Sequence, residues 1–150
     1  MPPTLSADEQ RKLEQLAQLI LKNYRFRGPP VPIETIMRSP PEGLLEAIDI
    51  SDLSIVFGVG EHRYEYRMAM ARLLYREICR REGEHGMELP HGAGASRYFA
   101  SALLIPKKWL MRATRWPFTT LEDLSEKFEV PEYVMAPRLM QLGKQVRGME

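Results

Sequence analysis

Three arginines recur at helical spacing in a stretch that contains neither glycine nor proline. Arg72, Arg76 and Arg80 are four residues apart, and Glu65 lies on the same face, seven residues before the first of them. In an α-helix this spacing stacks the guanidinium groups, and like charges so placed repel by roughly a few tenths of a kcal/mol per pair. An acidic partner or a bound anion could offset the repulsion. Carboxylates of the chain's own acidic segment near residue 126 could also do so, and we favour this explanation because structural ion pairs are the commoner cause of such clusters.

A second basic segment, residues 89–121, has no acidic side chain and carries two tryptophans. Lys108, Arg112 and Arg115 share one helical face there. Cations beside exposed aromatic rings can neutralise phosphates and stack on bases, so this segment is the best candidate for a nucleic-acid surface. The acidic segment 122–132 favours the alternative, in which the tryptophans pack internally and the cations pair with carboxylates. The residues concerned are Arg97, Lys107, Lys108, Arg112, Arg115, Trp109 and Trp116.

Side chains that bind transition metals are scarce, since the chain contains three histidines and one cysteine. His85 and His91 occur in a glycine-rich segment with Glu84 and Glu88, but they do not have the spacing of two ligands on one helix face. We expect these four residues to lie in an exposed loop. Cys79 falls within a helical pattern, where a buried apolar thiol is the usual interpretation. We therefore expect no metal site and no bound zinc.

The overall composition is that of an ordinary folded chain. It has 150 residues, of which 44% are hydrophobic and 27% charged, with 21 Lys and Arg against 20 Asp and Glu. This length suits a single domain over residues 1–150. A net charge of +1 argues against adhesion of the whole surface to nucleic acid or membrane. Neither a signal peptide nor an apolar run of about 20 residues is present, so we expect a cytoplasmic protein without a membrane segment.

Caps and periodicity predict the elements of the first third. Ser6 and Glu9 form a capping box, and the apolar stripe that follows predicts a helix that Gly28 terminates. A short helix over residues 33–37 should come next. The β-branched content and alternation of residues 44–50 and 54–59 predict two strands joined by a turn. The expected fold class is therefore α+β, mainly helical with a small antiparallel sheet.

The pattern of the remaining residues predicts helices. Residues 61–82 predict the longest helix, which should be central to the fold, and residues 96–105 predict a second buried helix that Pro106 terminates. A helix-turn-helix-like segment over residues 119–143 should close the chain, beginning with a capping box over 119–122. Its last helix contains Pro137, which should kink the helix or delay its start. This helix has few side chains that could read bases. We therefore expect the segment to pack within the fold and not to bind DNA.

The order of these features resembles that of the ImmA/IrrE family, which are zinc-metallopeptidase-like proteins associated with cleaving or controlling helix-turn-helix repressors. The resemblance covers residues 9–143. FASALLIP, residues 99–106, is similar to the family's ANxFAxxLLMP. The closing LEDLSEKFEVPEYVMAPRLMQLG, residues 121–143, is similar to LAxxFxVSxxxxxxRLxxLG. The resemblance implies a zincin-like fold.

The family's catalytic motif is HExxH, in which two histidines bind zinc and the glutamate is the general base. Through the family's RxxxAHELGH frame, which Arg67 and Ala71 match, the resemblance places the ligands on Arg72 and Arg76 and the base on Leu73. It places the third ligand on Ala95. A guanidinium stays protonated and has no lone pair for zinc, and leucine cannot transfer a proton. The implied site is degenerate.

Three hypotheses of function follow. The first is a catalytically inactive, metallopeptidase-like pseudoenzyme that binds a protein partner, such as a helix-turn-helix regulator of transcription, through the degenerate cleft. The second is a nucleic-acid-binding module that uses the basic and aromatic face. The third is a zinc peptidase whose ligands, His85 and His91 among them, lie elsewhere than the resemblance places them. The candidate binding residues are Arg72, Arg76, Arg80, Arg97, Lys108, Arg112 and Arg115, and the oligomeric state stays open.

Overall fold

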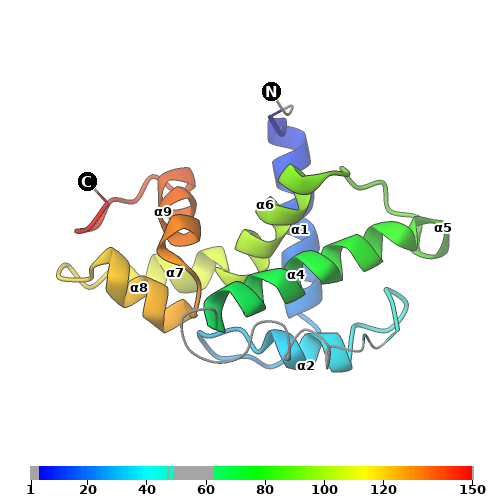
Figure 1. Cartoon of the computed structure of the whole chain (residues 1–150), viewed down its shortest axis with the longest axis horizontal. Helices are drawn as coiled ribbons and strands as arrows, with labels where there is room; N and C mark the ends of the chain where they lie inside the picture. The colour runs from blue at the N-terminus through cyan, green and yellow to red at the C-terminus, as the bar shows by residue number, and fades with distance from the viewer. Residues whose placement is uncertain (1–3, 47, 49–62, 150) are drawn as a thin grey trace.

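The computed structural model describes residues 4–46, 48 and 63–149, and helices dominate this part of the chain. None of its helices is both long and apolar enough to cross a bilayer. In the order of the chain, the helices are α1 (Ala7–Leu21), α2 (Ile33–Arg38), α4 (Arg63–Arg80), α5 (Glu82–His85), α6 (Ala93–Leu104), α7 (Lys107–Ala113), α8 (Leu121–Phe128) and α9 (Glu132–Gln141) (Figure 1).

The expected antiparallel sheet is wrong for the described residues, whose fold class is all-α rather than α+β. Residues 44–46 and 48 form a turn and irregular backbone, and residues 54–59 lie outside the described part. Leu44 and Leu45 are both buried, 6% and 9% exposed, although successive strand residues point to opposite faces. The apolar content of this segment therefore fills a helical core and does not mark one face of a strand. The extended pairing among the described residues is an isolated bridge between Thr120 and Arg147.

Helix α6 lies at the centre of the helical assembly and packs against both α1 and α4 (Figure 1). Phe99, Leu103 and Leu104 are fully buried, and the small residues between them let neighbouring helices approach closely. The Phe99 ring lies 4.9 Å from the ring of Tyr75 on α4, centroid to centroid. The FASALLIP motif thus has a packing role, as an apolar helix covered on several sides.

Two capping boxes fix the starts of α1 and α8. Ser6 and Glu9 exchange side-chain and backbone hydrogen bonds at 3.1 and 2.9 Å, as the sequence predicts. At α8 the N-cap is Thr120 and its partner is Asp123, with bonds of 3.1 and 3.2 Å, so the expected box over 119–122 is one position too early. Helix α1 also ends earlier than Gly28 suggests, at Leu21.

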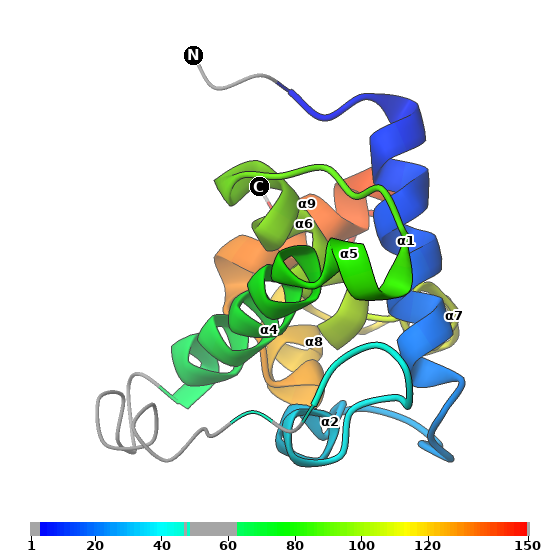
Figure 2. The same ribbon diagram turned by 90° about the vertical axis from the view of Figure 1, so that its right-hand side faces the viewer.

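Arg67, near the start of α4, holds three separate segments together. Its Nε donates to the carbonyl of Glu129 at 3.0 Å, and Nη2 donates to the carbonyl of Val31 at 2.7 Å. Glu129 ends α8 with a positive φ of 55°, which aims its carbonyl away from the helix. Val31 precedes α2, which packs beneath α4 (Figure 2). These contacts give Arg67 a structural role. Its match to the RxxxAHELGH motif therefore needs no catalytic explanation.

The closing pair α8 and α9 packs as a helical hairpin. Helix α9 begins at Glu132 and continues through Pro137, so the proline does not delay its start. Val134, Met135 and Leu139 are buried. Arg138 is buried as well, although it is charged, because Glu14 of α1 pairs with it. These buried residues give the segment a packing role, and the expectation that it does not read DNA stays a prediction.

Candidate functional site

The structure separates the positions that the resemblance groups into one degenerate site. Arg72 and Leu73 are half-buried on α4, whereas Arg76 is exposed one turn later. Ala95 is 1% exposed and belongs to the hydrophobic core. Arg72 and Arg76 consequently line two different pockets along α4, and Ala95 contributes to neither.

The first pocket, of about 260 Å³, lies where α4, α6 and α9 meet. Arg72 and Arg97 supply its positive charge, and Tyr98, Ser101 and Tyr133 supply hydroxyl groups. The Nε atom of Arg72 is buried and has no hydrogen-bond partner among the described residues. A buried guanidinium donor without an acceptor is costly, and Nε of Arg72 is such a donor within the part of the chain that the structure describes.

Glu65 contacts the pocket residue Tyr133 and forms no ion pair with an arginine among the described residues. The Tyr133 hydroxyl donates to Glu65, with distances of 2.5 and 2.6 Å to the two carboxylate oxygens. Partial burial and this hydrogen bond raise the pKa of Tyr133 to about 12, against the opposing effect of the Arg72 charge. The Glu65 carboxylate thus accepts from a neutral donor, and no ion pair among the described residues involves Arg72.

The expectation that the acidic segment neutralises the arginines is wrong for the described residues. Among the ion pairs described, Arg80 pairs with Glu77 at 2.7 Å, within its own helix, and none joins Arg72 or Arg76 to residues 122–132. The same ion pairs include none between the basic segment and that acidic segment. Apart from Arg80, the candidate binding residues therefore form no ion pair among the described residues.

The second pocket, of about 600 Å³, opens where α4 ends and α6 begins. Arg76 and Arg80 border it, and Tyr75, Cys79 and His91 contribute side chains to its wall. Burial raises the pKa of the Cys79 thiol, a hydrogen bond with Tyr75 opposes this, and Glu82 adds to the rise. The thiol is therefore no activated nucleophile at neutral pH.

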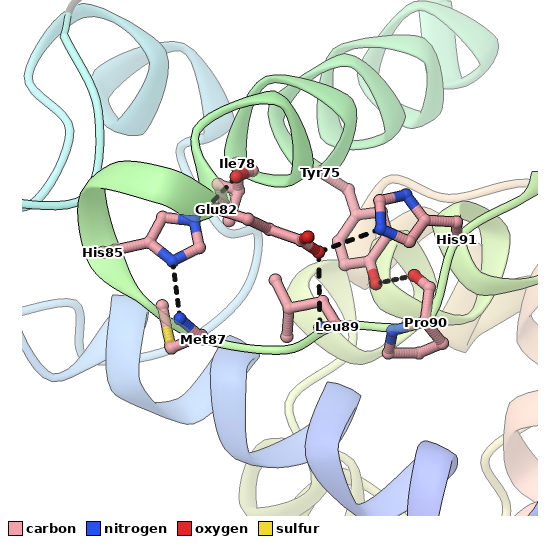
Figure 3. A network of polar contacts seen from close by, with 8 residues as sticks. All are labelled: Tyr75, Ile78, Glu82, His85, Met87, Leu89, Pro90 and His91. Carbon is pink, nitrogen blue, oxygen red and sulfur yellow. Dashed lines mark hydrogen bonds and ion pairs between the residues drawn. The ribbon is translucent and has the colours of Figure 1, made fainter.

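His85 and His91, which the sequence places in one exposed loop, have different roles (Figure 3). The Nδ1 atom of His85 accepts from the backbone N–H of Met87 at 3.1 Å, so Nε2 carries the proton and donates to the carbonyl of Ile78 at 2.7 Å. Both nitrogens of this ring are occupied by the backbone. His85 closes the end of α4 and is not free to bind a metal.

His91 instead faces the α4–α5 junction (Figure 3). Its Nε2 atom lies 2.9 Å from Oε1 of Glu82. One potential ligand atom each from Cys79, Glu82 and His91 lies within 4.8 Å of the others. In the sequence His91 is closer to His85, Glu84 and Glu88 than to Cys79 and Glu82, so this group is not evident from sequence position. The sequence pattern that could have indicated a metal site is the three-residue spacing of Cys79 and Glu82 at the end of a helix.

Lys108 and Arg112 on α7 are exposed to solvent, and so is Arg115 just after the end of this helix. The two tryptophans differ. Trp109 packs against the core, whereas Trp116 is 65% exposed and makes an edge-on contact with Phe118 at 5.9 Å. The interpretation of both tryptophans as internal packing residues is thus wrong for Trp116.

Comparison with protein-family models, curated proteins and solved structures finds no match to this chain. The likeness to the ImmA/IrrE family therefore stays a prediction from its motifs. The structure gives both motifs packing roles in α6 and α9, and it gives Arg67 a structural role. The two pockets and the exposed Trp116–Phe118 pair are the features of the described residues that bear on function.

Proposed function

We propose that the chain is a catalytically inactive, ImmA/IrrE-like domain that binds a protein partner in the cytoplasm, a helix-turn-helix regulator or a complex that contains one. The partner binds in the pocket around Arg72. The observation that carries this proposal is the buried Nε of Arg72, which has no acceptor among the described residues. After a rotation of the Arg72 side chain toward the pocket, a carboxylate of the partner would supply that acceptor, and charge-assisted bonds of this kind are among the stronger ones.

The shape and charge of the pocket define the partner's contact. A volume of about 260 Å³ accommodates one or two side chains rather than a folded element. Arg72 and Arg97 favour a carboxylate, while Met68, Val134 and Pro137 favour an apolar neighbour. The recognised segment therefore carries an Asp or Glu next to an aliphatic or aromatic residue.

Catalysis at the family's positions is not part of the proposal. Arg72 and Arg76 cannot bind zinc and Leu73 cannot act as a base. We propose that zinc is absent from these three positions, and that the domain acts by binding alone.

A quantitative affinity capture tests the proposal. The full chain and an Arg72→Met variant are used to capture proteins from the native host, with Arg80→Met as a matched control on the same helix. We expect the native chain and the control to enrich one helix-turn-helix regulator and the Arg72→Met variant to lose it. Equal enrichment by all three proteins, with circular dichroism showing folded variants, would contradict the proposal.

A second function is favoured by a separate observation, the exposed Trp116–Phe118 pair beside Arg112 and Arg115. Aromatic rings next to cations stack on the bases of single-stranded nucleic acid. Binding of a labelled single-stranded oligonucleotide should then quench Trp116 fluorescence and weaken steeply as salt rises. A Trp116→Ala variant should bind about 1–3 kcal/mol more weakly. The absence of binding at low ionic strength would exclude this function.

A further inference from the structure

We propose that Cys79, Glu82 and His91 form a binding site for a divalent transition-metal ion of the zinc type, at the junction of α4 and α5. The site is distinct from the positions that the family resemblance implies, and it does not depend on the proposed partner. It also departs from the sequence expectation that the chain holds no metal site.

The three side chains come from three elements that meet at one point. Cys79 is in the last turn of α4, Glu82 begins α5, and His91 precedes α6. Their nearest potential ligand atoms lie within 4.8 Å of one another. Bonds of about 2.0–2.3 Å to a tetrahedral zinc ion place ligand atoms roughly 3.5 Å apart. Small side-chain rotations therefore complete the coordination, and the backbone need not move.

The ligand set selects a class of metal. A thiolate and an imidazole suit zinc and its neighbours among the transition metals, whereas magnesium and calcium prefer oxygen alone. Binding replaces the proton of Cys79, which is released to solvent, so the thiolate and the Glu82 carboxylate together balance the charge of the ion. His91 is 64% exposed, and the adjoining pocket of about 600 Å³ gives the ion access from solvent. A fourth coordination position remains for water.

Neighbouring residues hold two of the ligands in place, as metal sites require (Figure 3). The backbone N–H of Leu89 donates to Oε1 of Glu82 at 3.4 Å. The Tyr75 hydroxyl donates to the carbonyl of Pro90 and so fixes the residue before His91. His85, bonded to the carbonyl of Ile78 at 2.7 Å, holds α5 against α4.

The local positive charge does not prevent binding. Arg80, which borders the pocket, is paired with Glu77 at 2.7 Å and points its charge there. Arg76 is exposed to solvent, where its field is screened. The two negative charges of the site, on the Cys79 thiolate and the Glu82 carboxylate, exceed the positive charge that Arg76 and Arg80 leave near the ion.

Metal titration of the full chain tests the site. The purified protein is stripped with a chelator, kept reduced, and titrated with Co²⁺ and then with Zn²⁺ in competition with a chromophoric chelator. We expect one Co²⁺ per chain with a thiolate-to-cobalt charge-transfer band in the near ultraviolet, and displacement of that band by Zn²⁺. Substitutions Cys79→Ser, Glu82→Gln and His91→Asn should each weaken Zn²⁺ binding at least about tenfold, and Cys79→Ser should abolish the band.

Matched controls separate the site from general surface binding. Glu84→Gln changes a carboxylate of the same short helix, and Glu88→Gln changes an exposed one in the following loop. Both should bind Zn²⁺ as tightly as the native chain. The proposal is overturned if the native chain binds no stoichiometric metal, if the band is absent, or if folded ligand variants bind like the controls. Partner capture through Arg72 is unaffected by each of these outcomes.

Discussion

Glu14 and Arg138, 124 positions apart in the sequence, form a two-pronged ion pair that joins the first helix to the last. Nη2 of Arg138 donates to Oε1 of Glu14 at 2.9 Å, and Nη1 donates to the other carboxylate oxygen. The Tyr98 hydroxyl donates to Glu14 at 2.9 Å, and Nε of Arg138 donates to the Ile105 carbonyl at 3.1 Å. The arginine is 1% exposed, so its charge depends on this one carboxylate.

Replacing Glu14 with glutamine should destabilise the fold strongly. The substitution leaves the Arg138 guanidinium buried without a countercharge, and breaking such a pair costs about 3 kcal/mol. Urea unfolding followed by circular dichroism measures the loss. Glu34→Gln is the matched control, because Glu34 forms an exposed pair with Arg38 at 3.9 Å. That change should cost less than about 1 kcal/mol, and equal losses in the two variants would contradict the assigned role of Glu14.

The contribution of Glu14 should also depend on pH in the acid range. Burial alone would raise the pKa of Glu14, but the hydrogen bonds and charge of Arg138, helped by Tyr98, lower it below its ordinary value. A carboxyl with a lowered pKa in the fold stabilises the protein above its ordinary pKa of about 4.3. That stability is lost as the pH falls from there through the folded pKa. The difference in unfolding free energy between the native chain and Glu14→Gln should therefore shrink below about pH 4 and be constant at neutral pH.

Arg67 should not tolerate lysine, even though the charge is kept. Its Nε and Nη2 reach two carbonyls, those of Glu129 and Val31, and an ammonium group lacks this planar fork. We expect Arg67→Lys to lower the free energy of unfolding by about 1–3 kcal/mol, because at least one partly buried carbonyl loses its donor. Thermal unfolding measures the change.

Arg76→Lys is the control for Arg67→Lys, since Arg76 is exposed on the same helix. A surface change of this kind should alter stability by less than about 0.5 kcal/mol. A similar loss in both variants would mean that the bonds of Arg67 contribute little.

Local signals predicted most of the helices, because caps and apolar stripes act within a few residues. Ser6 marks the start of α1 through bonds that the neighbouring residues complete themselves. The strand prediction over 44–50 is wrong for the described residues 44–46 and 48, because Leu44 and Leu45 are both buried in the hydrophobic core instead of pointing to opposite faces. β-Branched content in a short segment does not reveal which partner will cover it.

The candidate sites could be predicted only in part, because they depend on tertiary placement. The spacing of Lys108 and Arg112 indicates that they share a helical face, and both side chains are exposed on α7. Cys79 and Glu82 come close to His91 only because the loop after α5 folds back on α4. No local sequence pattern specifies this path of the chain. The Tyr75 hydroxyl, bonded to the Pro90 carbonyl, contributes to this return of the chain.

The N-cap of α8 offers a local test of stability. Thr120 accepts a hydrogen bond from the backbone of Asp123 at 3.1 Å, so Thr120→Ala should cost about 1 kcal/mol. Thr119→Ala distinguishes the observed cap from the neighbouring position that the sequence suggested. Thr119 makes only a long contact of 3.5 Å to the Ala113 carbonyl, and its loss should cost less. Chemical denaturation of both variants gives the comparison, and a larger cost for Thr119→Ala would place the cap one residue earlier.

Removal of the Tyr75 hydroxyl should weaken both the fold and the proposed metal site. In Tyr75→Phe the Pro90 carbonyl loses its donor while the ring keeps its packing against Phe99, so stability should fall by about 1 kcal/mol. The loop that carries His91 is then held less firmly and Cys79 loses its hydrogen bond with Tyr75, so Zn²⁺ affinity should fall by about tenfold, as it does when outer contacts of a metal ligand are lost. Tyr133→Phe is the matched control, since it removes an exposed hydroxyl bonded to Glu65 on another part of the surface. It should leave Zn²⁺ affinity unchanged, and an equal loss of affinity in the two variants would show that Tyr75 does not position His91.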